Sequence, residues 1–142
     1  MGPAAEKVNV IVGAALKPFR IESVSSQSMK TWAVILHDPN PIHLDPAVVK
    51  AKGLGERVIN QGPVNLAYLI NMLHAAVPGG SIESLEVRYV DNVFAGDAVE
   101  AGGAVTAVSS DVGRRKLVCD VWLRADGRGP VLTGSATISA PI

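Results

Sequence analysis

The sequence is short of cysteine and of clustered metal ligands. Cys119 is the one cysteine in 142 residues, so a disulfide within the chain is excluded. Its place in an apolar, strand-like run predicts a buried thiol. None of the histidines, His37, His43 and His74, has a cysteine or a second histidine at the spacing of a metal site. We therefore expect no metal centre.

Long apolar runs and targeting segments are also missing. No stretch of about 18 apolar residues occurs, so no membrane-spanning helix is expected. Residues 1–7 lack the apolar core of a signal peptide, and Glu6 stands where a myristoylation site needs serine or threonine. We expect residues 1–7 to be disordered and the protein to be cytoplasmic, with no membrane partner.

Charge is scarce and balanced. Charged residues make up 18% of the sequence and hydrophobic residues 48%, and Lys plus Arg equals Asp plus Glu at 13 each. A neutral balance without a basic cluster argues against nucleic-acid binding through phosphate contacts. The length predicts a single domain over residues 1–142. So few charges favour burial of part of its surface against a second subunit, and we expect a homodimer.

What the sequence does contain is a carboxylate and an imidazole in a proline-rich loop, Asp38-Pro39-Asn40-Pro41-Ile42-His43. Each proline fixes its own φ and disfavours helical conformation in the residue before it. The segment is therefore predicted to be a stiff turn, with Asp38 and His43 projecting from its ends. Asp and Asn before Pro are also ordinary turn residues. A rigid acid-base turn, however, suits the positioning of two groups on one water molecule.

The whole string resembles the motif of the MaoC-like dehydratases, the family of (R)-specific enoyl-CoA hydratases. Their pattern Asp-x-Asn-Pro-(Ile/Leu/Val)-His is followed by x-Asp and later by a glycine that opens a long apolar helix. The matching residues here are Asp38, Asn40, Pro41, Ile42, His43, Asp45 and Gly62. The segments Leu85–Tyr89 and Val93–Asp97 resemble the family's strand pair, usually apolar-x-Val-Arg-Phe and then Pro-Val-x-x-Gly-Asp. The resemblance covers about residues 15–139.

The resemblance implies an α+β hot-dog fold, in which an antiparallel sheet wraps around a long central helix. It implies a hydratase or dehydratase that interconverts 2-enoyl and (R)-3-hydroxyacyl thioesters, carried on CoA or an acyl carrier protein. In the family the residues that match Asp38 and His43 share the reacting water; which of them is the base stays open. No cofactor is expected, because the thioester itself activates C2 and C3.

Three further residues complete the candidate site. Gly62 opens a predicted helix, where a free N–H and the absence of a Cβ let a thioester oxygen approach. Asn40 either braces the loop or only caps its own backbone. Gln61 either offers a side-chain donor near the thioester or faces solvent. Asp45, followed by Pro46, is expected to be a helix cap only.

The chain departs from the family pattern at a few positions around the motif, namely His37, Gln61, Pro63 and Asn92. His37 stands where the family has a small residue, and we expect it to face solvent unless it acts beside Asp38. These departures affect the expected substrate more than the reaction. They keep open a family member diverted to another elimination or cyclisation.

The remaining patterns predict helices and strands. A helix is expected from Met29 to Leu36 with Ser28 as N-cap, a short one from Pro46 through Lys52, and a long one over Gly62–Ala76. Strands are expected at residues 8–13, 19–24, 81–89, 98–108, 115–123 and 131–139. The apolar face of the long helix is predicted to consist of Leu66, Leu69, Ile70, Leu73 and Val77.

Two alternative functions are compatible with the predicted fold. A hot-dog thioesterase would place its carboxylate on or near the long helix, and no Asp or Glu occurs from Gln61 to Ala76. A non-catalytic acyl-binding subunit would be expected to lack Asp38 or His43, and both are present. The sequence therefore favours the hydratase.

Overall fold

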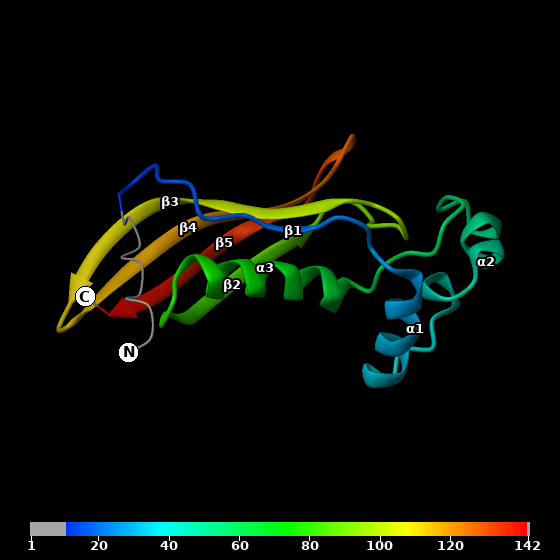
Figure 1. Ribbon diagram of the computed structural model, residues 1–142, viewed down its shortest axis with the longest axis horizontal. Helices are drawn as coiled ribbons and strands as arrows, with labels where there is room; N and C mark the ends of the chain where they lie inside the picture. The colour runs from blue at the N-terminus through cyan, green and yellow to red at the C-terminus, as the bar shows by residue number, and fades with distance from the viewer. Residues whose placement is uncertain (1–10, 142) are drawn as a thin grey trace.

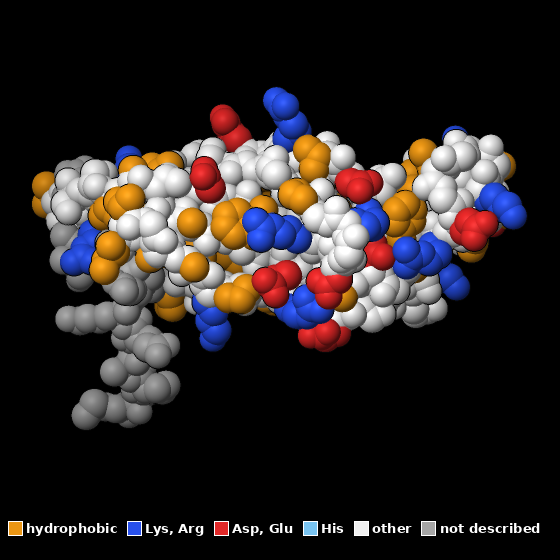
Figure 2. All heavy atoms as spheres, turned by 90° about the horizontal axis from the view of Figure 1, so that it is seen from above, with side chains coloured by type: hydrophobic (Ala, Val, Ile, Leu, Met, Phe, Trp, Pro, Cys, Tyr) orange, Lys and Arg blue, Asp and Glu red, His pale blue; other side chains and the backbone are white. Residues whose placement is uncertain are grey.

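The computed structural model describes residues 11–141, and a five-stranded antiparallel sheet is its largest element. The strands are β1 (Phe19–Ile21), β2 (Ser81–Tyr89), β3 (Val99–Asp111), β4 (Arg114–Ala125) and β5 (Gly129–Pro141). Their spatial order is β1-β3-β4-β5-β2, so β1 and β2 form the edges (Figure 1). Charged side chains of both signs are interspersed over the outer face of the sheet (Figure 2).

The strand predictions agree closely with the structure. β2 has the predicted bounds, and β3, β4 and β5 begin and end within three residues of theirs. The strand predicted at 19–24 is shorter, because the chain leaves the sheet after Ile21. Part of the predicted strand 8–13 and all of the predicted disordered segment 1–7 lie outside the described residues. The segment around Leu16 runs beside β3, since Leu16 N–H donates to Gly103 C=O at 2.8 Å.

The long helix α3 (Gly62–Ala76) has the predicted bounds and lies against one face of the sheet. Leu69, Leu73 and Val77 are buried as predicted. Leu66 and Ile70 are only half-buried, and Met72 is fully buried instead. The face that meets the sheet is therefore rotated toward Met72 and Ala76. Cys119 of β4 is buried in the same core, as predicted.

The remaining helices lie beyond one end of the sheet and of α3 (Figure 1). They are α1 (Ser26–Ile35), the 3₁₀ turn η1 (Pro41–His43) and α2 (Pro46–Ala51). Asp45 caps α2 as predicted, with its side chain accepting from Ala47 N–H at 2.9 Å. The N-cap predicted for α1 is wrong: Ser25, not Ser28, caps it, because Ser25 Oγ accepts from the Ser28 N–H and the helix starts at Ser26. No helix in residues 11–141 is long and apolar enough to span a membrane.

Candidate active site

Asp38 is placed by the C-terminal cap of α1. Asp38 N–H donates to Ala33 C=O at 2.9 Å and His37 N–H to Val34 C=O at 3.2 Å. These two bonds form a Schellman motif, which needs a left-handed residue after the C-cap. His37 takes that position with φ +50°, the one non-glycine residue with positive φ in the described chain. Asp38 therefore follows a strained but well-defined helix end.

The turn between Asp38 and His43 is held by Asn40. Its N–H donates to Asp38 Oδ1 at 3.2 Å, and its side-chain oxygen accepts from Ile42 N–H at 3.3 Å. Pro41 then begins η1, at a position that proline favours. Asn40 thus braces the loop, and in doing so it also holds one oxygen of Asp38.

His43 is brought onto Asp38 by the segment that precedes α3. Its Nδ1 lies 2.6 Å from Ile59 C=O, and Ile59 N–H donates to Ile42 C=O at 2.9 Å. The His43 ring is buried, and its Nε2 lies 3.2 Å from Asp38 Oδ2. Asp38 remains about one-third exposed, with 34% of its side-chain surface accessible. The pair therefore has one buried and one accessible member.

These contacts decide which ring nitrogen of His43 carries a hydrogen. A carbonyl oxygen only accepts, so Nδ1 of His43 must carry a hydrogen toward Ile59. The lone pair of a neutral Nε2 would then face the carboxylate across 3.2 Å, and the two would repel. A proton placed between Nε2 and Oδ2 would turn this contact into a hydrogen bond. A carboxylate and an imidazole in such a contact are groups that can give and take protons in general acid-base catalysis.

The first turn of α3 offers a single free backbone donor. Val64 and Asn65 N–H both donate to Gln61 C=O, at 3.1 and 3.2 Å, and Pro63 has no N–H. Within the described chain no hydrogen bond uses the Gly62 N–H. The peptide is trans, so this N–H points opposite to the Gln61 carbonyl, outward from the helix N-terminus. Gly62 follows Ile59 by three residues, which limits the separation of their Cα atoms to about 10 Å.

The side chain of Gln61 is buried and not solvated. Its side chain is 0% exposed, and Nε2 donates to Met29 C=O at 2.8 Å, which ties α3 to α1. Its Oε1 is buried and has no hydrogen-bond partner in the described chain. A solvent-facing Gln61 is therefore wrong, and one N–H of its amide braces α1 against the start of α3.

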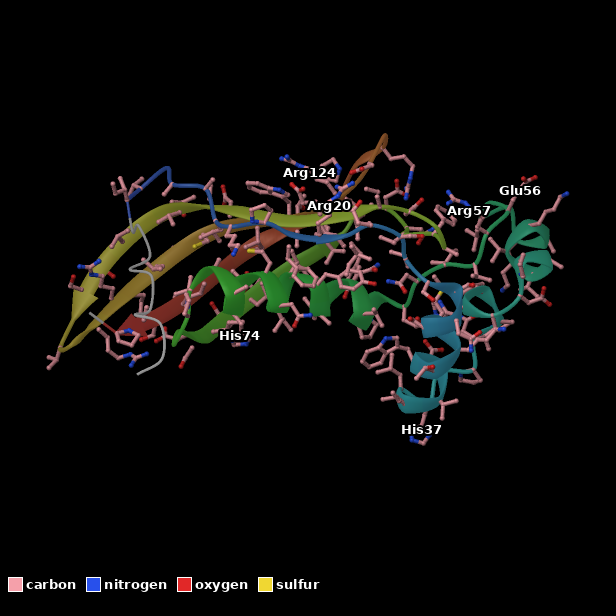
Figure 3. All side chains as sticks on the ribbon, in the orientation of Figure 1. Arg20, His37, Glu56, Arg57, His74 and Arg124 are labelled. Atoms are coloured by element: carbon pink, nitrogen blue, oxygen red, sulfur yellow. The ribbon has the colours of Figure 1, made fainter. Side chains whose placement is uncertain are left out.

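The other histidines lie away from the pair. His37, at the end of α1, is exposed and points away from the rest of the molecule, and His74 lies on the face of α3 opposite the sheet (Figure 3). The solvent-facing position expected for His37 is confirmed. Asn92 stands where the family has proline in the strand turn. Its backbone carbonyl accepts a hydrogen bond from Arg128 at 2.9 Å.

Three residues of this region were missed from the sequence, namely Ile59, Asn60 and Tyr89. Ile59 acts through its backbone carbonyl, which no side-chain pattern reports. Asn60 is buried and donates to Asn65 Oδ1 at 2.8 Å, inside α3. Tyr89 donates to Gly62 C=O at 3.0 Å. Tyr89 is the last residue of the segment Leu85–Tyr89, at the position where the family usually has phenylalanine. Its additional hydroxyl could therefore have been noticed in the sequence.

A surface groove of about 500 Å³ lies beside the turn. Its walls are mostly apolar and come from α1 and from the two ends of the loop: Lys30, Ala33, Val34, Pro39 and Leu44. Pro39 and Leu44 directly follow Asp38 and His43 in the sequence. The pair is thus flanked by apolar surface.

The sequence is similar to known proteins of one family. The family model described as MaoC like domain matches residues 9–121. The chain is 32% identical over 114 residues to the (R)-specific enoyl-CoA hydratase of Aeromonas caviae, covering 78% of this chain and 81% of that protein. It is 28% identical over 114 residues to the mitochondrial 3-hydroxyacyl-[acyl-carrier-protein] dehydratase of Arabidopsis thaliana, covering 80% of this chain but 66% of that longer protein.

Solved structures show the same architecture. The (R)-hydratase from A. caviae involved in PHA biosynthesis superposes with a TM-score of 0.82 at 24% identity, covering 94% of this chain and 98% of that one. The MaoC-like dehydratase from Rhodospirillum rubrum gives 0.79 at 19% identity and covers 94% of each chain. The predicted α+β hot-dog fold is confirmed.

Proposed function

Because this chain belongs to the MaoC-like domain family of hydratases and dehydratases, we propose that it interconverts 2-enoyl and (R)-3-hydroxyacyl thioesters carried on CoA or an acyl carrier protein. The observation that carries the proposal is the contact between Asp38 and His43. It joins a carboxylate that is about one-third exposed to a buried imidazole whose other nitrogen is fixed by Ile59.

The pair holds the protons that the reaction needs. In hydration the water oxygen bonds to C3 while the unprotonated member of the pair takes a proton from that water. The electrons of the C2–C3 double bond move toward the thioester carbonyl. The proton held by the other member then goes to C2. The pair ends with one proton, as it began, and dehydration runs the same steps in reverse.

Gly62 is the proposed partner of the charge that builds up on the thioester oxygen. Its N–H has no hydrogen-bond partner among residues 11–141, stands at the positive end of a 15-residue helix and points outward from it. A donor in such a place supplies about 3–4 kcal/mol of transition-state stabilisation. Asn40 supports Asp38 in this scheme, and Gln61 holds the start of α3 against α1.

We also propose that the protein acts as a homodimer. β2 is a long edge strand, and its inward side chains Ile82, Leu85 and Val87 stay only half-buried. An edge of this kind pairs readily with another strand, and a second copy would cover it. Light scattering at micromolar concentration should give twice the chain mass of 14.8 kDa. A mass of one chain would contradict the dimer without touching the chemistry.

A thioester panel tests the function. Enoyl thioesters of increasing acyl length, each on CoA and on an acyl carrier protein, are incubated with the protein, and the loss of the conjugated enoyl absorbance is followed. Hydration to the (R)-3-hydroxyacyl product is expected for at least one acyl length. Asp38→Asn is the matched control, since it removes the carboxylate and keeps its shape. Equal turnover by both proteins, or none by the wild type on any thioester, would overturn the proposal.

A further inference from the structure

Tyr89 contacts Gly62 in two ways. Its hydroxyl donates to the Gly62 carbonyl at 3.0 Å. Its ring and hydroxyl atoms lie 3.4, 3.5 and 3.7 Å from the point where a Cβ on Gly62 would stand. The ring therefore covers the open side of the glycine Cα, while the hydroxyl holds the next peptide group.

Such a contact matters because glycine does not hold its own conformation. A residue without a Cβ has a wide choice of φ and ψ, so neighbours must fix the direction of its N–H. On one side, Gln61 C=O is held by the N–H groups of Val64 and Asn65. On the other side, the Gly62 carbonyl accepts from the Tyr89 hydroxyl in addition to the hydrogen bonding of α3 itself. The two peptide planes that meet at Gly62 are thus both restrained.

Tyr89 is itself fixed by the core of the sheet. It is the last residue of β2 and pairs with Leu132 of β5, which is fully buried. The next residue, Val90, donates through its N–H to Val131 C=O at 3.0 Å. Rigid strands therefore reach the N-terminus of α3 through this one side chain. Half of the Tyr89 surface, 49%, remains exposed.

We propose that Tyr89 is a positioning residue that aims the Gly62 amide at the thioester oxygen. The inference rests on the proposed function, because it assigns Tyr89 a part in that reaction. A donor adds to catalysis only where it is held in place before the charge appears, and small misplacements are costly. Tyr89 supplies that restraint from the sheet, on the side that Gln61 does not reach.

The test removes only the hydroxyl. Tyr89→Phe keeps the ring over Gly62 and should lower kcat about 3- to 10-fold, the equivalent of one neutral hydrogen bond, with KM unchanged. Tyr89→Ala also removes the ring and should lower kcat on the order of 10²-fold. The matched control is Tyr68→Phe. The Tyr68 hydroxyl accepts from Asn60 Nδ2 at 3.2 Å, and the side-chain bond to the Gly62 carbonyl comes from Tyr89, so kcat should stay at the wild-type value.

A second background separates positioning from general damage. Gly62→Pro has no amide to aim, so Tyr89→Phe should lower kcat no further in it. In the wild-type background, the Gly62 amide signal in ¹H–¹⁵N spectra should shift in Tyr89→Phe and stay in place in Tyr68→Phe.

The outcomes are distinct. An unshifted Gly62 amide, or wild-type kcat in Tyr89→Phe alongside an inactive Asp38→Asn, overturns the role of Tyr89 and leaves the hydratase standing. A wild type that hydrates no thioester overturns the function, and the spectra alone then decide whether Tyr89 holds the Gly62 amide.

Discussion

Nε2 of His43 lies 3.2 Å from Oδ2 of Asp38, and the contact joins the loop that follows α1 to the last residue of η1. The contact depends on backbone groups at both ends: the α1 cap fixes Asp38, and Ile59 C=O fixes the imidazole. Both side chains are thereby held in one contact, and in the proposed reaction they act as one unit.

If Asp38 and His43 act as one unit, the losses of kcat caused by replacing each of them should not add. We expect Asp38→Asn and His43→Ala each to lower kcat by about 10²–10⁴-fold with the fold intact. The double variant should be no worse than the worse single variant, because either change already stops the transfer. Steady-state kinetics on the best enoyl thioester, with circular dichroism as the folding control, measures this. Multiplicative losses would mean that the two residues act independently.

Removing the Gly62 donor should be possible without breaking the helix. Gly62 is the first residue of α3, where proline is accepted, and Gln61 before it has φ −65° and ψ 139°, which suits a residue that precedes proline. We expect Gly62→Pro to lower kcat about 10²–10³-fold. Gly62→Ala keeps the N–H, and its Cβ would meet Tyr89 at an ordinary 3.4 Å, so it should lose far less. A similar loss of kcat in Gly62→Pro and Gly62→Ala would mean that the added side-chain atoms, and not the missing N–H, cause the effect.

Much of this was readable from the sequence, because it depends on local rules. The proline pattern predicted the turn, and the bounds of α3 followed from Gly62-Pro63 at one end and Pro78 at the other. The failures arise where tertiary contacts decide. No periodicity could reveal that Ile59 offers its carbonyl to His43. Gln61 is polar, which favours a solvated side chain, yet the packing of α1 onto α3 buries it completely.

His37 gives a stability prediction. A side chain in the left-handed region costs about 1–2 kcal/mol, and glycine avoids this cost. We expect His37→Gly to stabilise the fold by about 1 kcal/mol and to raise Tm by roughly 3–4 °C. Gly53 ends α2 with φ +68° and open space around it, so Gly53→Ala is the mirror control and should destabilise by a similar amount. An unchanged or lower Tm in His37→Gly would show that the imidazole makes a stabilising contact.

Cys119 gives a pH prediction. Burial, assisted by the charge of Asp120, raises the pKa of its thiol above the ordinary value of 9.0. A raised pKa in the folded state means that the buried thiol stabilises fully below pH 9 and loses this contribution as the pH rises through the folded pKa. The stability advantage of the wild type over Cys119→Ala should therefore shrink above pH 9 in urea titrations. Iodoacetamide should label the thiol slowly in the native protein and rapidly in urea, and equal rates would contradict its burial.

The last prediction concerns the loop that carries Ile59. Asp97 is 11% exposed, accepts hydrogen bonds from Phe94 N–H at 2.9 Å and from Arg128, and forms an ion pair with Arg57 at 3.1 Å. The two guanidinium groups lie 5.4 and 5.2 Å from the centre of the Phe94 ring. Arg57 belongs to the loop that leads to Ile59 and also donates to Ala95 C=O at 2.7 Å. Asp97 therefore holds this loop to the turn before β3.

Replacing this carboxylate should weaken both the fold and the site. Asp97→Asn keeps the shape and loses the charge, and hydrogen bonds to charged groups are worth about 1.5–3 kcal/mol, so a loss of that size is expected in urea unfolding. Asp126→Asn is the matched control, because Asp126 also pairs with an arginine, Arg20, but is 56% exposed, and little change is expected there. Some loss of kcat should accompany Asp97→Asn, since Ile59 orients His43 from the same loop. Equal effects of the two substitutions would show that Asp97 is one more surface ion pair and that the loop is held by its backbone bonds alone.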